Sequence, residues 1–68
     1  MEIQIVIINK FGEFKGEILN VTQEQYETLT TMSSEYYKEG FEMMCEDGSF
    51  LVIPPELIKK SIYKINHV

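Results

Sequence analysis

Alternating apolar and polar positions divide the chain into short strands on either side of one helix. Residues Glu2 to Asn9 alternate isoleucine with other residue types, as a strand does, and the intervening positions are also half apolar. This pattern predicts a central strand that is covered on both faces. Asn9-Lys10-Phe11-Gly12 then predicts a turn, and Glu13 to Asn20 the second strand of a hairpin. Because Gly16 within that strand has no side chain, we expect a β-bulge or a close backbone approach there.

One long amphipathic helix is predicted from Thr22 to Glu39. Thr22 and Gln25 form a capping box, in which each side chain bonds an otherwise unpaired backbone N–H at the start of the helix. Apolar and aromatic side chains then recur at helical spacing, and Gly40 ends the helix as a residue that is free to adopt positive φ. We expect this helix to cover one face of the sheet and so to organise the fold.

A second hairpin is predicted around Asp47-Gly48, a dipeptide that favours a two-residue β-turn. Its first strand, Phe41 to Glu46, alternates apolar and polar residues. In the register of a two-residue turn, two pairs form the core face: Cys45 with Phe50 and Met43 with Val52. Three apolar side chains then fall on the opposite face: Met44, Leu51 and Ile53. That face is more apolar than a solvated sheet face should be, so we expect it to be covered.

The C-terminal quarter of the chain predicts a short helical turn and a last strand. Pro54-Pro55 ends the second hairpin because proline cannot donate to a ladder, and Pro55 to Ile58 suits one helical turn. Ser61 to Asn66 is the predicted final strand. The whole order indicates a single small α+β domain over residues 1–68, with an antiparallel sheet packed on the helix. The helical turn before the last strand resembles SH3-like and Sm-like small barrels, which implies a partly open barrel as the alternative; the long helix departs from those patterns.

The small size of the chain predicts self-association. A chain of 68 residues buries only about 60% of its unfolded surface, and such domains usually need a staple or a partner. One cysteine excludes an internal disulfide, and Cys45 with His67 is too small a set for a four-ligand zinc site. We therefore expect a homo-oligomer, with a dimer as the commonest closed assembly. The predicted interface consists of Met44, Leu51 and Ile53.

The charge distribution limits the classes of partner. The formal net charge is −5, and the acidic residues are concentrated between positions 11 and 50, whereas residues 51–68 carry three lysines against one glutamate. This excess of acid argues against a surface for duplex nucleic acid. The sequence lacks a signal-peptide pattern and a long apolar run, so a cytoplasmic protein without membrane association is expected. A free thiol fits a reducing compartment.

Catalytic, metal and cofactor patterns are missing from the sequence. Cys45 alternates with Phe41 and Met43, as a buried structural thiol would, and His67 lies where fraying is expected. The acidic residues around Asp47 lack the alternating oxygen ligands of a calcium loop. The four glycines occur singly, so no phosphate-binding loop is formed. A non-catalytic binding protein without a cofactor is therefore expected.

The amino-acid usage is strongly biased. Alanine and tryptophan are missing, whereas isoleucine, lysine and tyrosine are frequent, and this bias indicates an AT-rich coding genome. In composition, size and acidity the chain resembles the small early-gene proteins of bacteriophages and prophages. The resemblance covers no motif and transfers no functional residue. It implies an inhibitor of a host or defence pathway.

Two modes of binding are open to such an inhibitor. In the first, tyrosine rings stack on the base of a small anionic, nucleotide-like ligand and lysines bind its phosphate, although the same tyrosines could be core residues and the lysines ordinary surface. Because the chain has no arginine, lysine side chains would have to bind the phosphate. In the second mode, the acidic helix face or the apolar sheet face occludes a host protein. The candidate residues of the ligand site are Tyr36, Tyr37, Lys59, Lys60, Tyr63 and Lys64.

Overall fold

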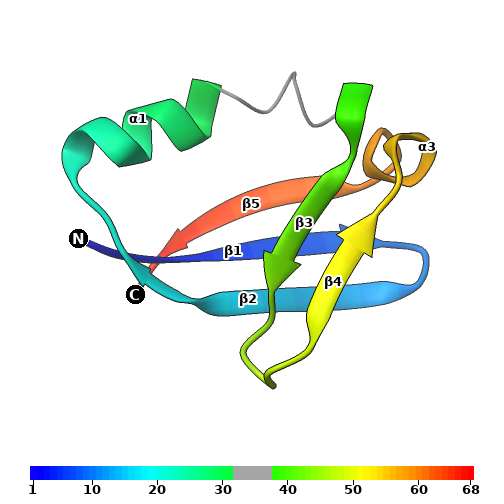
Figure 1. The fold of residues 1–68 in the computed structure, drawn as a ribbon, viewed down its shortest axis with the longest axis horizontal. Helices are drawn as coiled ribbons and strands as arrows, with labels where there is room; N and C mark the ends of the chain where they lie inside the picture. Colours follow the sequence, from blue (N-terminus) through cyan, green and yellow to red (C-terminus); the bar gives the residue numbers. More distant parts are fainter. Residues whose placement is uncertain (32–37) are drawn as a thin grey trace.

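The computed structural model describes residues 1–31 and 38–68. Figure 1 shows the elements in chain order: β1 (Glu2–Asn9), β2 (Gly12–Asn20), α1 (Gln23–Thr31), β3 (Phe41–Met44), β4 (Phe50–Ile53), α3 (Pro55–Ile58) and β5 (Ile62–His67). The strand pairs β1–β2, β1–β5 and β3–β4 are all antiparallel. The chain is therefore an α+β protein built on antiparallel strands.

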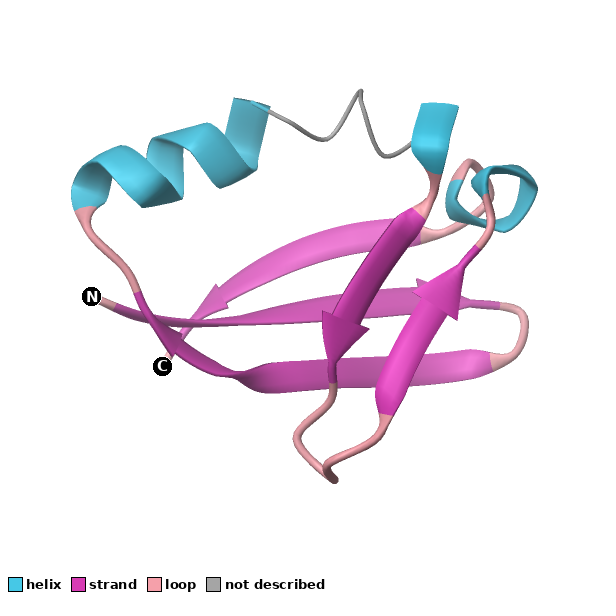
Figure 2. Ribbon diagram, viewed as in Figure 1, coloured by secondary structure: helices cyan, strands magenta, loops and turns pink. Residues whose placement is uncertain are grey.

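The strands form two sheets that face each other. The first has the order β2-β1-β5, with β1 in the predicted central position, and the β3–β4 hairpin is the second. The hairpin crosses over the three-stranded sheet (Figure 2). It is joined to β2 at one corner, where the Glu46 backbone N–H donates to the Lys15 carbonyl at 3.0 Å and Gly16 bridges to Cys45. Among the described residues no ladder joins β4 to β5, so this part of the chain does not form a closed barrel.

Gly16 makes this corner possible. The β1–β2 register shifts between Gln4 and Val6, so Gly16 and Glu17 together oppose Ile5 in a β-bulge. A Cβ atom on Gly16 would lie 3.1 Å from the Ile5 carbonyl oxygen and 3.5 Å from the Met44 carbonyl oxygen. The predicted bulge and the predicted close approach of another backbone are both confirmed.

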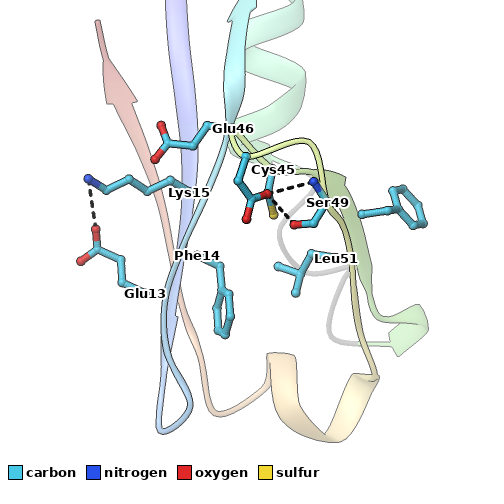
Figure 3. A pocket seen from close by; sticks show the side chains of 9 residues that line it. Glu13, Phe14, Lys15, Cys45, Glu46, Ser49 and Leu51 are labelled. Atoms are coloured by element: carbon cyan, nitrogen blue, oxygen red, sulfur yellow. Dashed lines mark hydrogen bonds and ion pairs between the residues drawn. The ribbon is translucent and has the colours of Figure 1, made fainter.

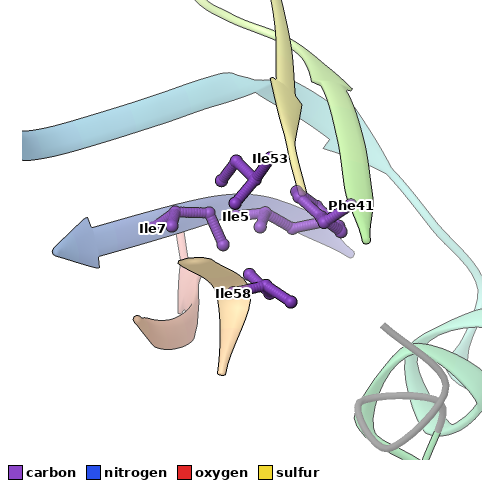
Figure 4. Packing of buried hydrophobic residues seen from close by; sticks show 5 residues of the cluster. All are labelled: Ile5, Ile7, Phe41, Ile53 and Ile58. Carbon is purple, nitrogen blue, oxygen red and sulfur yellow. The ribbon is translucent and has the colours of Figure 1, made fainter. Parts of the chain in front are cut away.

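The hydrophobic core lies between the three-stranded sheet, the hairpin and α3. Figure 4 shows its buried cluster, which consists of Ile5, Ile7, Phe41, Ile53 and Ile58. In contrast, no residue of α1 over Gln23–Thr31 is buried. For this described part, the prediction that the helix covers the sheet is wrong. The hairpin and α3 take that position because they present buried aliphatic side chains to β1, whereas Tyr26 and Leu29 of α1 are only half-buried.

The predicted start of the helix is confirmed. The Thr22 N–H donates to Gln25 Oε1 at 2.9 Å, and the Gln25 N–H donates to Thr22 Oγ1 at 3.1 Å, which completes the capping box. Lys38 and Glu39 are helical, and Gly40 follows them with φ of +88°. The predicted helical positions between residues 32 and 37 lie outside the described residues.

The β3–β4 hairpin differs from the prediction by one residue in register. The Cys45 N–H donates to the Ser49 carbonyl at 2.8 Å, and the Gly48 N–H donates to the Cys45 carbonyl at 3.0 Å. Three residues, Glu46, Asp47 and Gly48, therefore form the turn, and Gly48 has φ of +90°. This is the geometry of a three-residue loop with a glycine bulge, where the sequence pattern favours a two-residue turn.

The longer turn exchanges the two faces of β4. Because side chains alternate along a strand, a shift of one residue moves each of them to the other side. The observed pairs are Phe41 with Ile53, Glu42 with Val52, Met43 with Leu51 and Met44 with Phe50. Ile53 is buried in the core and Leu51 packs against the core cluster, while Phe50 and Val52 face outward. The predicted interface of Met44, Leu51 and Ile53 is corrected accordingly.

Candidate functional site

Among the residues that the structure describes, the outward face of the β3–β4 hairpin carries the largest group of exposed apolar side chains on neighbouring strand positions. We call Met44, Phe50 and Val52 the outer hairpin face; their exposed fractions are 43%, 58% and 60%. Met44 is paired with Phe50 across the two strands, and Val52 lies two residues further along β4. Side chains in such positions are close enough to contact one another, so they form one continuous apolar surface.

Hydrogen bonds within the turn fix the end of this hairpin. Asp47 Oδ1 accepts from the Ser49 N–H at 2.9 Å and from Ser49 Oγ at 2.6 Å. These two bonds to the charged form lower the pKa of Asp47 below its ordinary value. The turn therefore carries a carboxylate at neutral pH.

Acidic residues accompany the outer hairpin face. Glu42 lies on the same face because it is paired with Val52. Glu46 and Asp47 are in the turn, and Glu46 Oε2 accepts from Gln4 Nε2 at 3.0 Å. The apolar surface is thus combined with negative charge, which favours a partner with positive charge around an apolar patch.

A pocket of about 460 Å³ lies between β2 and the hairpin. Figure 3 shows Phe14 from β2 and Leu51 from β4 on its two sides. The lining residues include three carboxylates and one ammonium, and Lys15 Nζ is 3.8 Å from Glu13 Oε1. The described parts of the chain contain no group of three or more side chains that could hold a metal ion. The lining residues are Glu13, Phe14, Lys15, Cys45, Glu46, Asp47, Ser49, Phe50 and Leu51.

The candidate ligand residues that the structure describes lie in different surroundings. Tyr36 and Tyr37 lie outside the described residues. Tyr63 packs against the core cluster, with its ring centroid 5.7 Å from that of Phe41 and an interplanar angle of 79°, so its ring belongs to the core and is not a surface platform. Lys64 is exposed on β5, paired with Val6.

Lys59 and Lys60 are both exposed after α3. Lys60 lines a groove that is shared with the β1–β2 turn. Sequence reasoning missed two other members of this groove, Lys10 and Phe11, because their pattern predicts only a turn. It also missed Phe50 and Val52 as surface residues. The exposure of Phe50 and Val52 could have been predicted from the run Glu46-Asp47-Gly48-Ser49. Glycine as the last of three turn residues is typical of the bulged hairpin, which sets the observed register.

Cys45 and His67 have separate surroundings. Cys45 is buried, as predicted, at its bridge to Gly16. His67 is not frayed: it is the last residue of β5, its ring centroid is 5.1 Å from that of Tyr26, and its Nε2 is 3.3 Å from Tyr26 Oη. The expectation of fraying was wrong because the pairing of β5 with β1 continues to Ile3.

Function has to be inferred from these surfaces. None of the described helices is long and apolar enough to cross a membrane. The arrangement offers an apolar face with nearby carboxylates, a mixed pocket and a lysine-lined groove. No protein-family model matches the chain, and neither the curated proteins nor the solved structures give a match.

Proposed function

We propose that this protein is a non-catalytic inhibitor that occludes a host protein through the outer hairpin face. The observation that carries the proposal is the exposure of Met44, Phe50 and Val52 side by side on one strand pair. Complete burial of one such side chain contributes about 1.5 to 3 kcal/mol before the costs of association. Three together suit the centre of a small protein–protein interface.

Charge suggests the chemistry of the partner. Glu42 lies on the outer hairpin face, Glu46 and Asp47 lie in the adjacent turn, and the whole chain has a net charge of −5. An apolar patch surrounded by lysine or arginine would bury the three side chains and gain attraction at longer range. The resemblance in composition to early phage proteins is the reason for placing this partner in a bacterial host.

The first test changes the outer hairpin face and leaves the core alone. Val52→Glu places a charge at the centre of the proposed interface and should reduce capture of the partner from bacterial lysate at least tenfold, because a buried unpaired charge is costly. Ile62→Glu is the matched control: Ile62 is 61% exposed, close to the 60% of Val52, but lies on β5 opposite Ile8. Affinity capture with quantitative mass spectrometry measures both variants.

If the proposal is correct, at least one bacterial protein is retained both by the unchanged chain and by the Ile62→Glu variant. The Val52→Glu variant should lose that protein. Retention should also weaken as salt is added, because the proposed attraction is between opposite charges. Equal retention by Val52→Glu, or no retained protein at all, would contradict it.

A second copy of the chain is the competing occupant of this face. The homodimer expected from the sequence would now use Met44, Phe50 and Val52, and each copy would bring Glu42 and a net charge of −5 to the interface. Like charges in such positions are destabilising. We therefore expect sedimentation equilibrium at micromolar concentration to give a mass near 8.0 kDa for the isolated chain. A measured mass of twice that value would instead indicate a dimer. If the Val52→Glu variant then had a mass of 8.0 kDa, the outer hairpin face would be the dimer interface.

A further inference from the structure

We infer that the groove between the β1–β2 turn and α3 binds a nucleotide-like anion, whose phosphate contacts Lys10 and Lys60 and whose base stacks on Phe11. The groove has a volume of about 290 Å³, and its lining combines two lysines, an aromatic ring and one carboxylate. This inference does not rest on the outer hairpin face. The lining residues are Lys10, Phe11, Pro54, Glu56, Leu57 and Lys60.

Hydrogen bonds hold the two sides of the groove together. The Phe11 N–H donates to Asn9 Oδ1 at 2.9 Å, which shapes the turn. Asn9 Nδ2 then donates to Ser61 Oγ at 3.2 Å, and Ser61 Oγ donates to the Leu57 carbonyl at 2.8 Å. A chain of side-chain bonds thus connects the β1–β2 turn to the last turn of α3. Lys10 follows Asn9 and Lys60 precedes Ser61 in the chain, so the backbone segments that carry the two lysines are joined to each other.

The groove presents an aromatic surface and positive charge together. Lys10 Nζ lies 5.1 Å from the centroid of the Phe11 ring, and Phe11 is 67% exposed at the tip of the turn. An aromatic ring with most of its surface in solvent is available for stacking on a base. A ligand that joins a planar ring to a phosphate can use both features at once.

The ammonium groups of the two groove lysines are not paired with carboxylates in the described parts of the chain. Neither Lys10 nor Lys60 forms an ion pair with a carboxylate in the described ranges 1–31 and 38–68, where the observed pair is Lys15 with Glu13. Glu56 nevertheless lines the same groove and opposes an anion. Its presence predicts moderate affinity for an anion. Replacing Glu56 should therefore strengthen binding, whereas replacing a lysine should weaken it.

Adjacent lysines give a matched comparison. Adenosine 5′-monophosphate, added to the intact protein, should shift the backbone amide NMR signals of residues 9–12 and 56–61. Lys10→Ala and Lys60→Ala should each weaken binding about tenfold, as loss of a charged hydrogen-bond donor does. Lys59→Ala removes the same charge one residue earlier, outside the groove lining, and should change the dissociation constant less than threefold. If Lys59→Ala and Lys60→Ala weaken binding equally, the effect depends only on net charge, and the proposed site is wrong.

Two further variants test the chemistry of the groove. Glu56→Gln should tighten binding, because it removes the opposing carboxylate, and Phe11→Ala should weaken the nucleotide but leave inorganic phosphate unchanged. Absence of amide shifts at millimolar nucleotide, or weaker binding by Glu56→Gln, would overturn the proposal. A short single-stranded oligonucleotide tests whether the ligand is a free nucleotide or part of a strand. Tighter binding than the mononucleotide would identify a strand as the ligand, and equal binding would identify a free nucleotide. Val52→Glu should bind the nucleotide normally, so this site and the outer hairpin face can fail independently.

Discussion

Ile53→Ala is expected to lower the free energy of unfolding by about 2 to 5 kcal/mol, whereas Val52→Ala should change it by less than about 1 kcal/mol. Ile53 is 2% exposed within the core cluster, and its neighbour Val52 faces solvent. Truncation at position 53 therefore leaves a cavity between β1, β3 and α3, while truncation at position 52 leaves none. Urea denaturation followed by circular dichroism measures both values.

The comparison distinguishes the two possible registers of the hairpin. With a two-residue turn, Val52 would be the core residue and the order of the two effects would be reversed. A domain of 68 residues is stable by roughly 3 to 10 kcal/mol, so Ile53→Ala could leave too little folded protein to measure. Ile53→Val, with an expected loss of about 0.5 to 1.5 kcal/mol, keeps the comparison quantitative. A larger loss in Val52→Ala than in Ile53→Val would contradict the observed register.

Gly40→Ala is expected to be nearly as damaging, for two separate reasons. Gly40 has φ of +88°, and a side chain held in a disfavoured backbone region costs about 1 to 3 kcal/mol. In addition, a Cβ atom at this position would lie 2.6 Å from the Ile53 carbonyl oxygen, so the backbone itself would have to move. The total loss should therefore exceed the cost of the strained backbone alone.

Gly48→Ala separates these two costs. Gly48 has nearly the same φ, +90°, but a Cβ atom there would meet nothing within 4 Å. We expect Gly48→Ala to show the backbone cost alone and Gly40→Ala to show a larger loss in the same denaturation experiment. Equal losses would mean that the β4 backbone can move away from Gly40 without cost.

Local signals in the sequence predicted the elements well. The capping box of Thr22 and Gln25 depends on residues three apart, and the bulge at Gly16 follows from one missing side chain. Such features are decided by neighbours in the chain. The register of the second hairpin is also local, but it depends on whether Gly48 is the second of two turn residues or the last of three. One residue in that choice decides the face of every side chain on β4.

Longer-range arrangements could not be predicted in this way. Tyr26 and Leu29 have helical spacing in any case, but it is the hairpin and α3 that pack on β1, and α1 over Gln23–Thr31 has no buried residue. The groove is a similar case. Lys10 and Lys60 are fifty positions apart, and the pairing of β1 with β5, which sets Ile8 opposite Ile62, brings their segments together. Candidate sites chosen by proximity in sequence therefore united Lys60 with Lys59 and Lys64 and omitted Lys10.

The central position of β1 has a consequence for synthesis on the ribosome. β1 is made first, but its second neighbour, β5, pairs Ile3 with His67 and Ile8 with Ile62. One edge of an isoleucine-rich strand therefore stays unpaired until residues 62–67 have left the ribosome. Such pairing between distant residues is slow, and exposed strand edges are prone to aggregate. The nascent chain should consequently bind chaperones through β1 and lose this binding when β5 emerges.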